Sequence, residues 1–266
     1  MARVGRWVAE RWVFALALLV LGYLFLPIAV VAALSFNRPS NRLSYDFHEF
    51  TLDNWLNPCG PGAMCSSVWL SVQIGLISTL IATLLGTLMA FAMVRHRFRG
   101  RAATNLLIFL PMATPEVVMG SSLLALFVGA GIPLGFWTVV IAHVMFCVSF
   151  VVVTVKARLA GLDSRLEEAA MDLYASEWQT FRRITLPLVF PGILAAALLS
   201  FSLSFDDFII TNFNAGSSNV TFPMYVWGAA QRGIPPQVNV IGTAMFVISL
   251  LLVLASSVRR RRGVAA

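Results

Sequence analysis

The chain has 266 residues, of which 59% are hydrophobic and only 12% are charged. A soluble domain carries about 25% charged residues, so this chain has more apolar surface than one aqueous fold is able to bury. The net charge of +7 comes from short basic clusters between apolar runs rather than from one continuous stripe. This pattern is typical of a protein in contact with lipid, and it argues against nucleic-acid binding.

Six apolar runs follow one another along the chain, and each reaches the length of about 17–25 residues that a helix needs to cross a bilayer. They are Val13–Leu34, Val68–Val94, Ala103–Ala130, Phe136–Val155, Leu188–Ile210 and Val238–Val258. They lack the alternating pattern of a membrane β-barrel. The sequence therefore predicts an all-α membrane protein with about six transmembrane helices. The first run is too long for a signal peptide, so we expect it to be retained.

The distribution of arginine and lysine predicts the orientation of these helices. With the N-terminus inside, 16 basic residues fall on the cytoplasmic side and 3 fall outside. Because basic residues are retained on the cytoplasmic side, both termini are expected there. The expected parts are a cytoplasmic N-terminus at 1–12, a transmembrane domain at 13–258 and a cytoplasmic tail at 259–266.

Two of the three cysteines, Cys59 and Cys65, lie in a loop rich in proline and glycine that is predicted outside the membrane. In an oxidising compartment the pair is able to form a disulfide that closes a small ring, and two free thiols are the alternative. A metal site is disfavoured because no further cluster of ligands lies nearby. Cys147 lies within an apolar run, where it is expected to be a small buried side chain.

The 156–187 segment is the one large loop predicted on the cytoplasmic side. Ser164 and Glu167 are spaced as a capping box, and Ser176 and Gln179 are spaced as a second one. They predict two short helices joined by a turn. The alternative is a plain loop with amphipathic helices resting on the membrane surface. Anionic lipid would repel the acidic first helix, which favours docking into a groove of a protein.

The same segment resembles a known motif. Glu168-Ala169-Ala170, Asp172 and Ala175, followed by Phe181, Ile184, Leu186 and Pro187, are similar to the EAA motif of permease subunits of ATP-binding-cassette (ABC) importers. The resemblance implies a type I (MetI-like) permease fold in a bacterial inner membrane. It also implies a coupling helix that docks on a cytoplasmic ATPase. The coupling residues that it implies are Glu167, Glu168, Ala169, Ala170, Asp172, Leu173, Tyr174 and Ala175.

One position departs from this motif, because Tyr174 stands where the family usually has glycine. Glycine enters a left-handed turn easily, while a bulky residue there costs about 1 kcal/mol or more. Two interpretations are open. Either the turn is built differently in this chain, or Tyr174 adds a contact to the ATPase.

The resemblance covers most of the chain and narrows to one group of importers. The stretches Tyr23-Leu-Phe-Leu-Pro27, Arg97-Phe98-Arg99-Gly100, Gly135-Phe136-Trp137, Ser204-Phe-Asp206-Asp207 and Pro236-Gln-Val-Asn239 are similar to the C-type permease of spermidine/putrescine importers. This implies that the subunit forms half of a pathway for polyamines. The alternatives are the same architecture carrying iron, an opine or an anion, and a proton-coupled carrier.

Acidic residues within the apolar runs suggest a cation pathway. Glu116 lies near the middle of the third run, after two prolines that favour a kink. Asp206 and Asp207 lie near the outer end of the fifth run, beside Phe205 and Phe208. Carboxylates and aromatic faces complement the amines of a polyamine. The plainer alternatives are a carboxylate buried by hydrogen bonds and phenylalanines that pack in the core.

The sequence lacks the motifs of an enzyme that acts alone. It has no GxxxxGK[ST] phosphate loop, no HExxH and no cysteine–histidine metal spacing. His143, in the fourth run, is expected to pack through hydrogen bonds rather than to bind a ligand. We expect no catalytic residue, metal or cofactor on this chain, and the resemblance implies ATP and Mg²⁺ on a partner ATPase. The implied partners are a second homologous permease subunit, an ATPase dimer, an extracytoplasmic binding protein and membrane lipid, with no nucleic acid.

Overall fold

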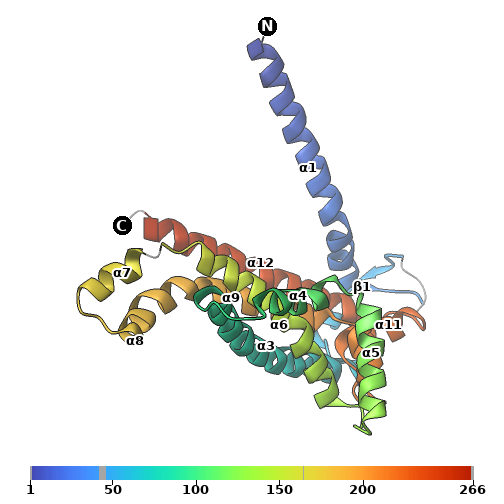
Figure 1. Ribbon diagram of the computed structural model, residues 1–266. Coiled ribbons are helices and arrows are strands. Elements are labelled where there is room, and N and C mark those ends of the chain that lie inside the picture. Colours follow the sequence, from blue (N-terminus) through green and yellow to red (C-terminus); the bar gives the residue numbers. More distant parts are fainter. Residues whose placement is uncertain (1, 42–45, 164, 265–266) are drawn as a thin grey trace. The chain divides into compact units, whose positions relative to one another are not determined.

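The computed structural model describes residues 2–41, 46–163 and 165–264 of the chain (Figure 1). The fold is helical almost throughout and divides into two compact units. One unit comprises Met1–Cys65 with Val226–Ala266, and the other comprises Ser66–Tyr225. Within the described residues, four helices are long and apolar enough to cross a membrane. They are Arg11–Ser35, Met64–Arg95, Phe136–Ala160 and Glu177–Asp206.

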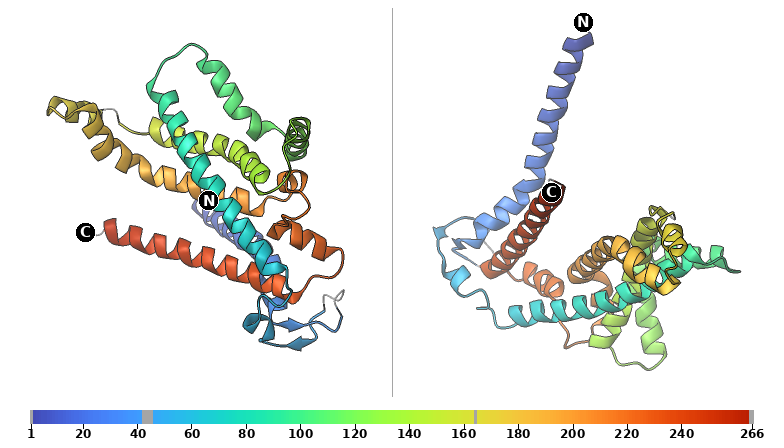
Figure 2. Two further views of the ribbon diagram at one scale, coloured as in Figure 1. Left: turned by 90° about the horizontal axis from the view of Figure 1, so that it is seen from below. Right: turned by 90° about the vertical axis from the view of Figure 1, so that its left-hand side faces the viewer.

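The first unit is built on α1 (Ala2–Ser35) and α12 (Pro236–Val264). The C-terminal part of α1 packs against α12 (Figure 2), where the ring centroids of Phe25 and Phe246 lie 6.1 Å apart. Helix α1 begins at Ala2 and continues without a break to Ser35. The structure therefore shows no break in the helix between the expected N-terminal segment at 1–12 and the first span.

A small extramembrane lobe follows α1 in the same unit. Strands β1 (Asn37–Arg38) and β2 (Glu49–Phe50) pair antiparallel, and α2 (Asp53–Leu56) follows them. The Asn54 side chain donates hydrogen bonds to the carbonyl oxygens of Ser35 (3.2 Å) and Asn37 (2.9 Å). These bonds tie α2 to the end of α1. The hairpin was not predicted from the sequence.

The second unit contains the remaining spans and the cytoplasmic segment. Its elements are α3 (Met64–Arg95), α4 (Arg101–Ala113), α5 (Glu116–Gly129), α6 (Phe136–Ala160), α7 (Arg165–Asp172), α8 (Glu177–Thr180), the π-helix η1 (Phe181–Thr185), α9 (Leu186–Asp206) and α10 (Ile209–Asn214). Helix α11 (Phe222–Ala230) and the first turn of α3 cross the boundary between the two units. Helix α6 packs against α4, α9 and α10, and more of α6 is buried than of any other candidate span in the described part of the chain.

Glycines allow two helix pairs in this unit to pack closely. A Cβ atom at Gly86 of α3 would lie 2.7 Å from the side chain of Val151 in α6. A Cβ atom at Gly120 of α5 would lie 2.9 Å from the ring of Phe213 in α10. Small residues at such contacts are the usual means by which membrane helices approach each other, so both pairs gain van der Waals contact.

The third predicted span is not one helix, and the kink expected there is a full break. Helices α4 and α5 meet at an angle of 107° across Thr114 and Pro115. Pro115 lacks an amide hydrogen and disfavours the helical conformation at the preceding residue, and Thr114 is accordingly extended (φ −81°, ψ 132°). Pro111, by contrast, is accommodated inside α4.

The fifth and sixth predicted spans also differ in detail. Helix α9 ends at Asp206, Asp207 is extended, and a separate α10 begins at Ile209, so the run predicted to reach Ile210 is interrupted. The sixth run corresponds to α12, whose apolar part within the described side chains, Pro236–Leu251, is shorter than a full span. The expectation of about six spans thus corresponds to four long helices, one broken pair and this shorter apolar helix.

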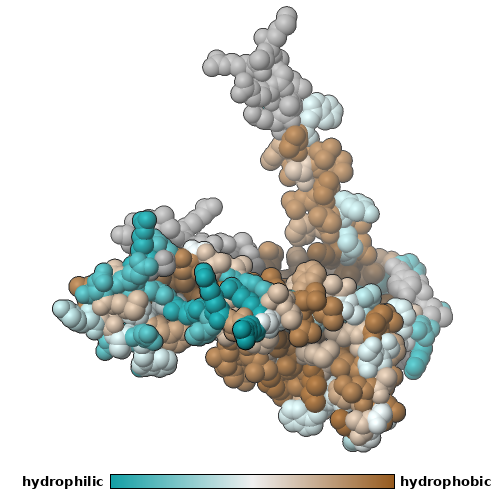
Figure 3. Space-filling view, in the orientation of Figure 1, coloured by the Kyte–Doolittle hydropathy of each residue, from teal (hydrophilic) through white to brown (hydrophobic). Residues whose placement is uncertain are grey.

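The surface of the chain separates into two kinds. Hydrophobic side chains cover the visible faces of α3 and α5, whereas hydrophilic side chains gather on the segment formed by α7 and α8 (Figure 3). Exposed large apolar residues such as Leu80, Leu84 and Leu88 repeat every fourth residue along α3. In a membrane, lipid covers such a face, so its exposure in an isolated chain needs no other explanation.

Candidate functional site

The cytoplasmic segment begins with α7, and no residue of this helix is buried. The carboxylate of Asp163 accepts the amide hydrogen of Arg165 (3.0 Å) and so caps the first turn. Ser164, to which the first capping box was assigned, lies outside the described residues. Glu167 and Glu168 lie in the first turn, where negative charge is favourable.

The two glutamates of this turn face different surroundings. The Glu167 carboxylate pairs with the guanidinium group of Arg95 and accepts a hydrogen bond from the hydroxyl of Thr185. Glu168 is exposed, as are Ala169 and Asp172. The face of α7 that contains Glu168 is therefore open to a partner, while Glu167 is committed to the chain itself.

The turn after α7 keeps the left-handed conformation although it contains a tyrosine. Tyr174 has φ 62°, and it is the only non-glycine residue with positive φ in the described part of the chain. Its amide donates to the carbonyl oxygen of Met171 (2.9 Å), and the amide of Ala175 donates to that of Ala170 (3.1 Å). These two bonds form a Schellman motif, in which glycine is the usual left-handed residue. The interpretation that the turn is built differently is therefore wrong.

The tyrosine side chain is not packed against the rest of the chain, so burial does not offset the cost of the left-handed conformation. Tyr174 is 98% exposed and the neighbouring Leu173 is 81% exposed. A bulky residue in the left-handed region costs about 1–2 kcal/mol. Leu173 and Tyr174 therefore form an exposed apolar surface on a strained turn.

The second predicted capping box is present in the structure. The amide of Gln179 donates to the hydroxyl oxygen of Ser176 (3.3 Å), and the amide of Ser176 donates to the side-chain oxygen of Gln179 (3.0 Å). Helix α8 starts there and continues through the π-helical η1 into α9. The cytoplasmic segment is therefore continuous with a membrane span.

Three carboxylates predicted for a substrate pathway come together at the two helix breaks. Glu116 is the first residue of α5, and Asp206 is the last residue of α9. Both are exposed in the isolated chain. Glu116 interacts electrostatically with Asp206 and Asp207, so the three acidic groups lie in one region. Their mutual repulsion makes this region a favourable place for a cation.

Asp207 differs from its neighbour because its carboxylate is bound on all sides. The residue is 9% exposed. One carboxylate oxygen accepts the amide hydrogen of Ile210 (3.3 Å), and the other accepts the amide (2.8 Å) and hydroxyl (2.7 Å) hydrogens of Thr211. The carboxylate therefore caps the first turn of α10 and satisfies amides that the helix break leaves without partners.

His143 of α6 extends this network to three further helices. Its Nε2 lies 3.3 Å from the Asp207 carboxylate and 2.9 Å from the Thr211 hydroxyl. Its Nδ1 lies 2.6 Å from the hydroxyl of Ser204 in α9, which in turn lies 2.9 Å from the hydroxyl of Ser78 in α3. His143 is 1% exposed. It thus packs through hydrogen bonds, as the sequence led us to expect.

The two phenylalanines predicted beside the carboxylates have different surroundings. Phe205 is buried (8% exposed), and its ring centroid lies 5.9 Å from that of Phe201 and 6.3 Å from that of Phe222. Phe208 lies between α9 and α10 and is half-buried. Packing within the unit accounts for the position of Phe205, which leaves its ring little free face for an amine.

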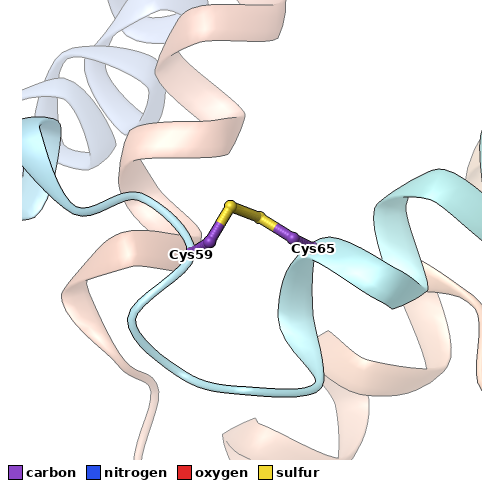
Figure 4. The surroundings of a disulfide bond; sticks show 2 residues. All are labelled: Cys59 and Cys65. Carbon is purple, nitrogen blue, oxygen red and sulfur yellow. A yellow bond between two sulfur atoms is a disulfide. The ribbon is translucent and has the colours of Figure 1, made fainter.

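Cys59 and Cys65 are joined by a disulfide, with their Cα atoms 5.4 Å apart (Figure 4). Cys59 lies in the loop after α2, and Cys65 lies in the first turn of α3. The bond closes the proline- and glycine-rich loop. Disulfides persist in oxidising compartments, so the bond agrees with the extracytoplasmic position predicted for this loop from the basic residues.

Comparison with known proteins identifies the family. Residues 82–261 match the family described as "Binding-protein-dependent transport system inner membrane component". The chain belongs to this family. It is an inner-membrane subunit of an ABC importer that works with a substrate-binding protein, and its relatives are transport permeases rather than enzymes.

Curated relatives of this permease cover nearly its whole length. It is 39% identical over 250 residues to the spermidine/putrescine transport system permease protein PotC of Haemophilus influenzae, an alignment that covers 94% of this chain and 96% of that protein. It is 38% identical to PotC of Escherichia coli, with 90% of each chain covered. It is also 35% identical to the putrescine permease PotI of E. coli, with 89% of this chain and 86% of that protein covered.

Solved structures show the fold of the permease. A bacterial ABC transporter that imports alginate matches 98% of this chain and 99% of its own chain, with a TM-score of 0.70 at 15% identity. The methionine transporter MetNI matches 75% of this chain and 95% of its own chain, with a TM-score of 0.58 at 15% identity. These likenesses confirm the predicted MetI-like fold.

Some residues that hold the permease together were not singled out from the sequence. Asn214 is fully buried, and its side chain donates to the carbonyl oxygens of Gly120 (3.3 Å) and Ile210 (2.8 Å). Arg95 was counted only as a cytoplasmic charge, although it pairs with Glu167. The available signal was polarity inside or next to an apolar run. That signal marks a residue that needs a partner but does not name the partner.

Proposed function

We propose that this permease forms one half of the translocation pathway of a polyamine importer for spermidine or putrescine. The observation that carries the proposal is the likeness to spermidine/putrescine permeases, at 38–39% identity over at least nine-tenths of the chain. The fold alone does not select the solute, since an importer of the acidic polysaccharide alginate shares it. The substrate argument therefore rests on the relatives and on the charges of the chain.

The acidic region at the helix breaks supports a cationic solute. Glu116 and Asp206 present exposed carboxylates near each other, and Asp207 adds a negative charge behind them. A polyamine offers amines separated by methylene groups, which match separated carboxylates better than an anion would. In this proposal Glu116 and Asp206 contact the substrate, Asp207 shapes the region from within, Phe208 lines it, and Phe205 supports it by packing against Phe201 and Phe222.

The cytoplasmic segment supports coupling to a separate ATPase. In this proposal α7 and the turn after it, Glu167 to Ala175, seat in a groove of the ATPase, with Glu168, Leu173 and Tyr174 at the contact. ATP and Mg²⁺ bind to that partner. A second homologous permease completes the pathway, and an extracytoplasmic binding protein delivers the substrate.

Uptake by the reconstituted transporter tests the proposal. The chain with its partner permease and ATPase, in vesicles with the binding protein outside, is expected to take up labelled spermidine or putrescine only when ATP is supplied on the ATPase side. Glu168→Lys is expected to abolish this uptake while the protein still inserts and purifies, because the charge reversal faces the ATPase.

The control is the same vesicle loaded with ADP. Polyamine uptake that persists with ADP, or without the ATPase, would favour a proton-coupled carrier and overturn the proposal. If the vesicles took up another solute with ATP but no polyamine, the chain would still be part of an importer, but the proposed substrate would be wrong. Normal uptake in Glu168→Lys would remove that residue from the coupling surface.

A further inference from the structure

The inner end of α3 contacts the cytoplasmic segment through an ion pair. Arg95, the last residue of α3, pairs through Nη2 with the carboxylate of Glu167 in α7. The Arg95 Nη2 also lies 3.4 Å from the hydroxyl of Thr185, which donates to the same carboxylate. Thr185 is 1% exposed, and the Glu167 side chain is 23% exposed. The three residues thus join α3, α7 and the end of η1.

A second contact lies one helical turn away on the same face of α3. The rings of Phe91 and Phe181 meet edge to face, with centroids 5.4 Å apart. Phe181 is in turn stacked on Trp178 of α8 at 5.6 Å. Since residues four apart lie above one another on a helix, Phe91 and Arg95 form one surface that contacts the cytoplasmic segment.

The segment that receives both contacts has an unusual backbone. Phe181 and Thr185 are the first and last residues of η1, the π-helix that connects α8 to α9. Single π-helical turns inside helices are rare and frequently lie at functional sites. Here the π-helical turn begins with the residue that meets Phe91 and ends with the residue that meets the Arg95–Glu167 pair.

We propose that Arg95 is a positioning residue that clamps α7 to α3 through Glu167, so that movement of α7 reaches two spans at once. The inference rests on the proposed coupling of α7 to an ATPase. Helix α7 is connected to α9 by the chain through α8 and η1, and the clamp adds a direct connection to α3. The adjacent glutamates have different roles in this proposal, since Glu167 faces α3 and Glu168 faces the partner.

The surroundings of the pair distinguish it from an ordinary surface ion pair. An isolated exposed pair contributes little, because water and salt screen it and two long side chains must be ordered. The Arg95 side chain is 41% exposed, but Glu167 is half-buried and receives a second, neutral donor from a fully buried threonine. Removal of Arg95 would leave this carboxylate without its counter-charge, which is costly for a partly buried group.

Charge reversal and charge exchange in the complete transporter test the clamp. Arg95→Glu and Glu167→Arg are each expected to lower polyamine uptake about tenfold while the ATPase still co-purifies and hydrolyses ATP, which raises the ATP consumed per substrate imported. The exchanged pair, Arg95→Glu with Glu167→Arg, is expected to recover most of the uptake. Arg97→Glu changes an exposed arginine in the loop after α3 and is the matched control. It is expected to keep the wild-type ratio of ATP consumed to substrate imported.

The outcomes separate this inference from the proposed function. If the wild-type complex shows no ATP-driven polyamine uptake, the proposed function fails. If the wild type transports but Arg95→Glu keeps the wild-type ratio of ATP to substrate, the clamp is wrong and the proposed function stands. Arg95→Gln removes the charge without adding repulsion, so it answers the question where Arg95→Glu does not fold. A normal ratio in Arg95→Gln would equally overturn the clamp.

Discussion

The two ends of α9 are held in opposite ways. At the C-terminal end, Asp207, His143 and Ser204 lie in a buried network in which each polar side chain has partners from neighbouring helices. At the N-terminal end, the cytoplasmic segment is joined to α3 by an ion pair and a stack of rings, and Leu173 and Tyr174 extend into the solvent.

The difference indicates which end of α9 is fixed within the chain and which end leaves a surface open. Local stability in a protein follows buried contacts and protected hydrogen bonds, so segments that have few of them open most easily. By this measure the corner between α9 and α10 is a rigid point of the permease. The cytoplasmic end has no buried residue in α7, is joined to α3 at a few contacts, and exposes apolar side chains.

The largest expected effect is the loss of the Asp207 carboxylate. Asp207→Ala would remove the carboxylate that accepts from the first amides of α10 and lies beside His143, and each buried donor left without a partner costs about 1–3 kcal/mol. We expect a large fall in the apparent midpoint of thermal unfolding in detergent and a low yield of folded protein.

Asp206→Ala is the matched control, because it removes the neighbouring but exposed carboxylate. It is expected to unfold like the wild type, because the carboxylate is exposed, and to transport less polyamine, because the proposed function places this carboxylate in contact with the substrate. If Asp206→Ala were the destabilised variant and Asp207→Ala unfolded normally, the comparison between the two ends of α9 would lose its basis.

A smaller effect is expected at Thr211, whose hydroxyl donates to Asp207 and contacts His143. Thr211→Val keeps the shape of the side chain and removes the hydroxyl, at a cost of about 1 kcal/mol for one hydrogen bond inside a membrane protein. The midpoint of thermal unfolding should fall by less than in Asp207→Ala. A fall as large as that of Asp207→Ala would mean that the hydroxyl, rather than the carboxylate, holds the corner.

A similarly small effect on stability is expected at Tyr174, and it has the opposite sign. Tyr174→Gly relieves the left-handed strain by about 1 kcal/mol, so amide hydrogens of α7 should exchange more slowly. The same variant should bind the ATPase more weakly, because it lacks the exposed ring. Tyr174→Ala is the control: it loses the ring but keeps most of the strain, so only the binding should change. Unchanged ATPase binding in both variants would show that the ring makes no contact.

The sequence was a good guide wherever the deciding interaction is local. Apolar length predicted the spans, and the spacing of Ser176 and Gln179 predicted the start of α8, because capping depends on residues three positions apart. The sequence shows that a tyrosine stands where the motif has glycine in a left-handed turn. It does not show which backbone conformation Tyr174 adopts, because a cost of about 1 kcal/mol is small enough for the surrounding helix to impose the left-handed conformation or a different one.

Prediction failed where the partners are distant in the chain. The residues beside Asp206 and Asp207 do not reveal which carboxylate is buried, because His143, one of the partners of Asp207, lies more than sixty positions earlier. The break after α4 was underestimated for a similar reason. A proline predicts a lost hydrogen bond, but whether a helix kinks or turns through 107° depends on what α5 packs against.

The disulfide has a practical consequence for anyone who labels this protein. Cys59 and Cys65 have no free thiol because they form a disulfide. Cys147, the remaining cysteine of the chain, is fully buried. Thiol reagents require an accessible thiolate, so the native chain should react with them very little. One cysteine introduced at Tyr174 or Asp206 would then carry a fluorophore or spin probe alone, without first removing the natural cysteines.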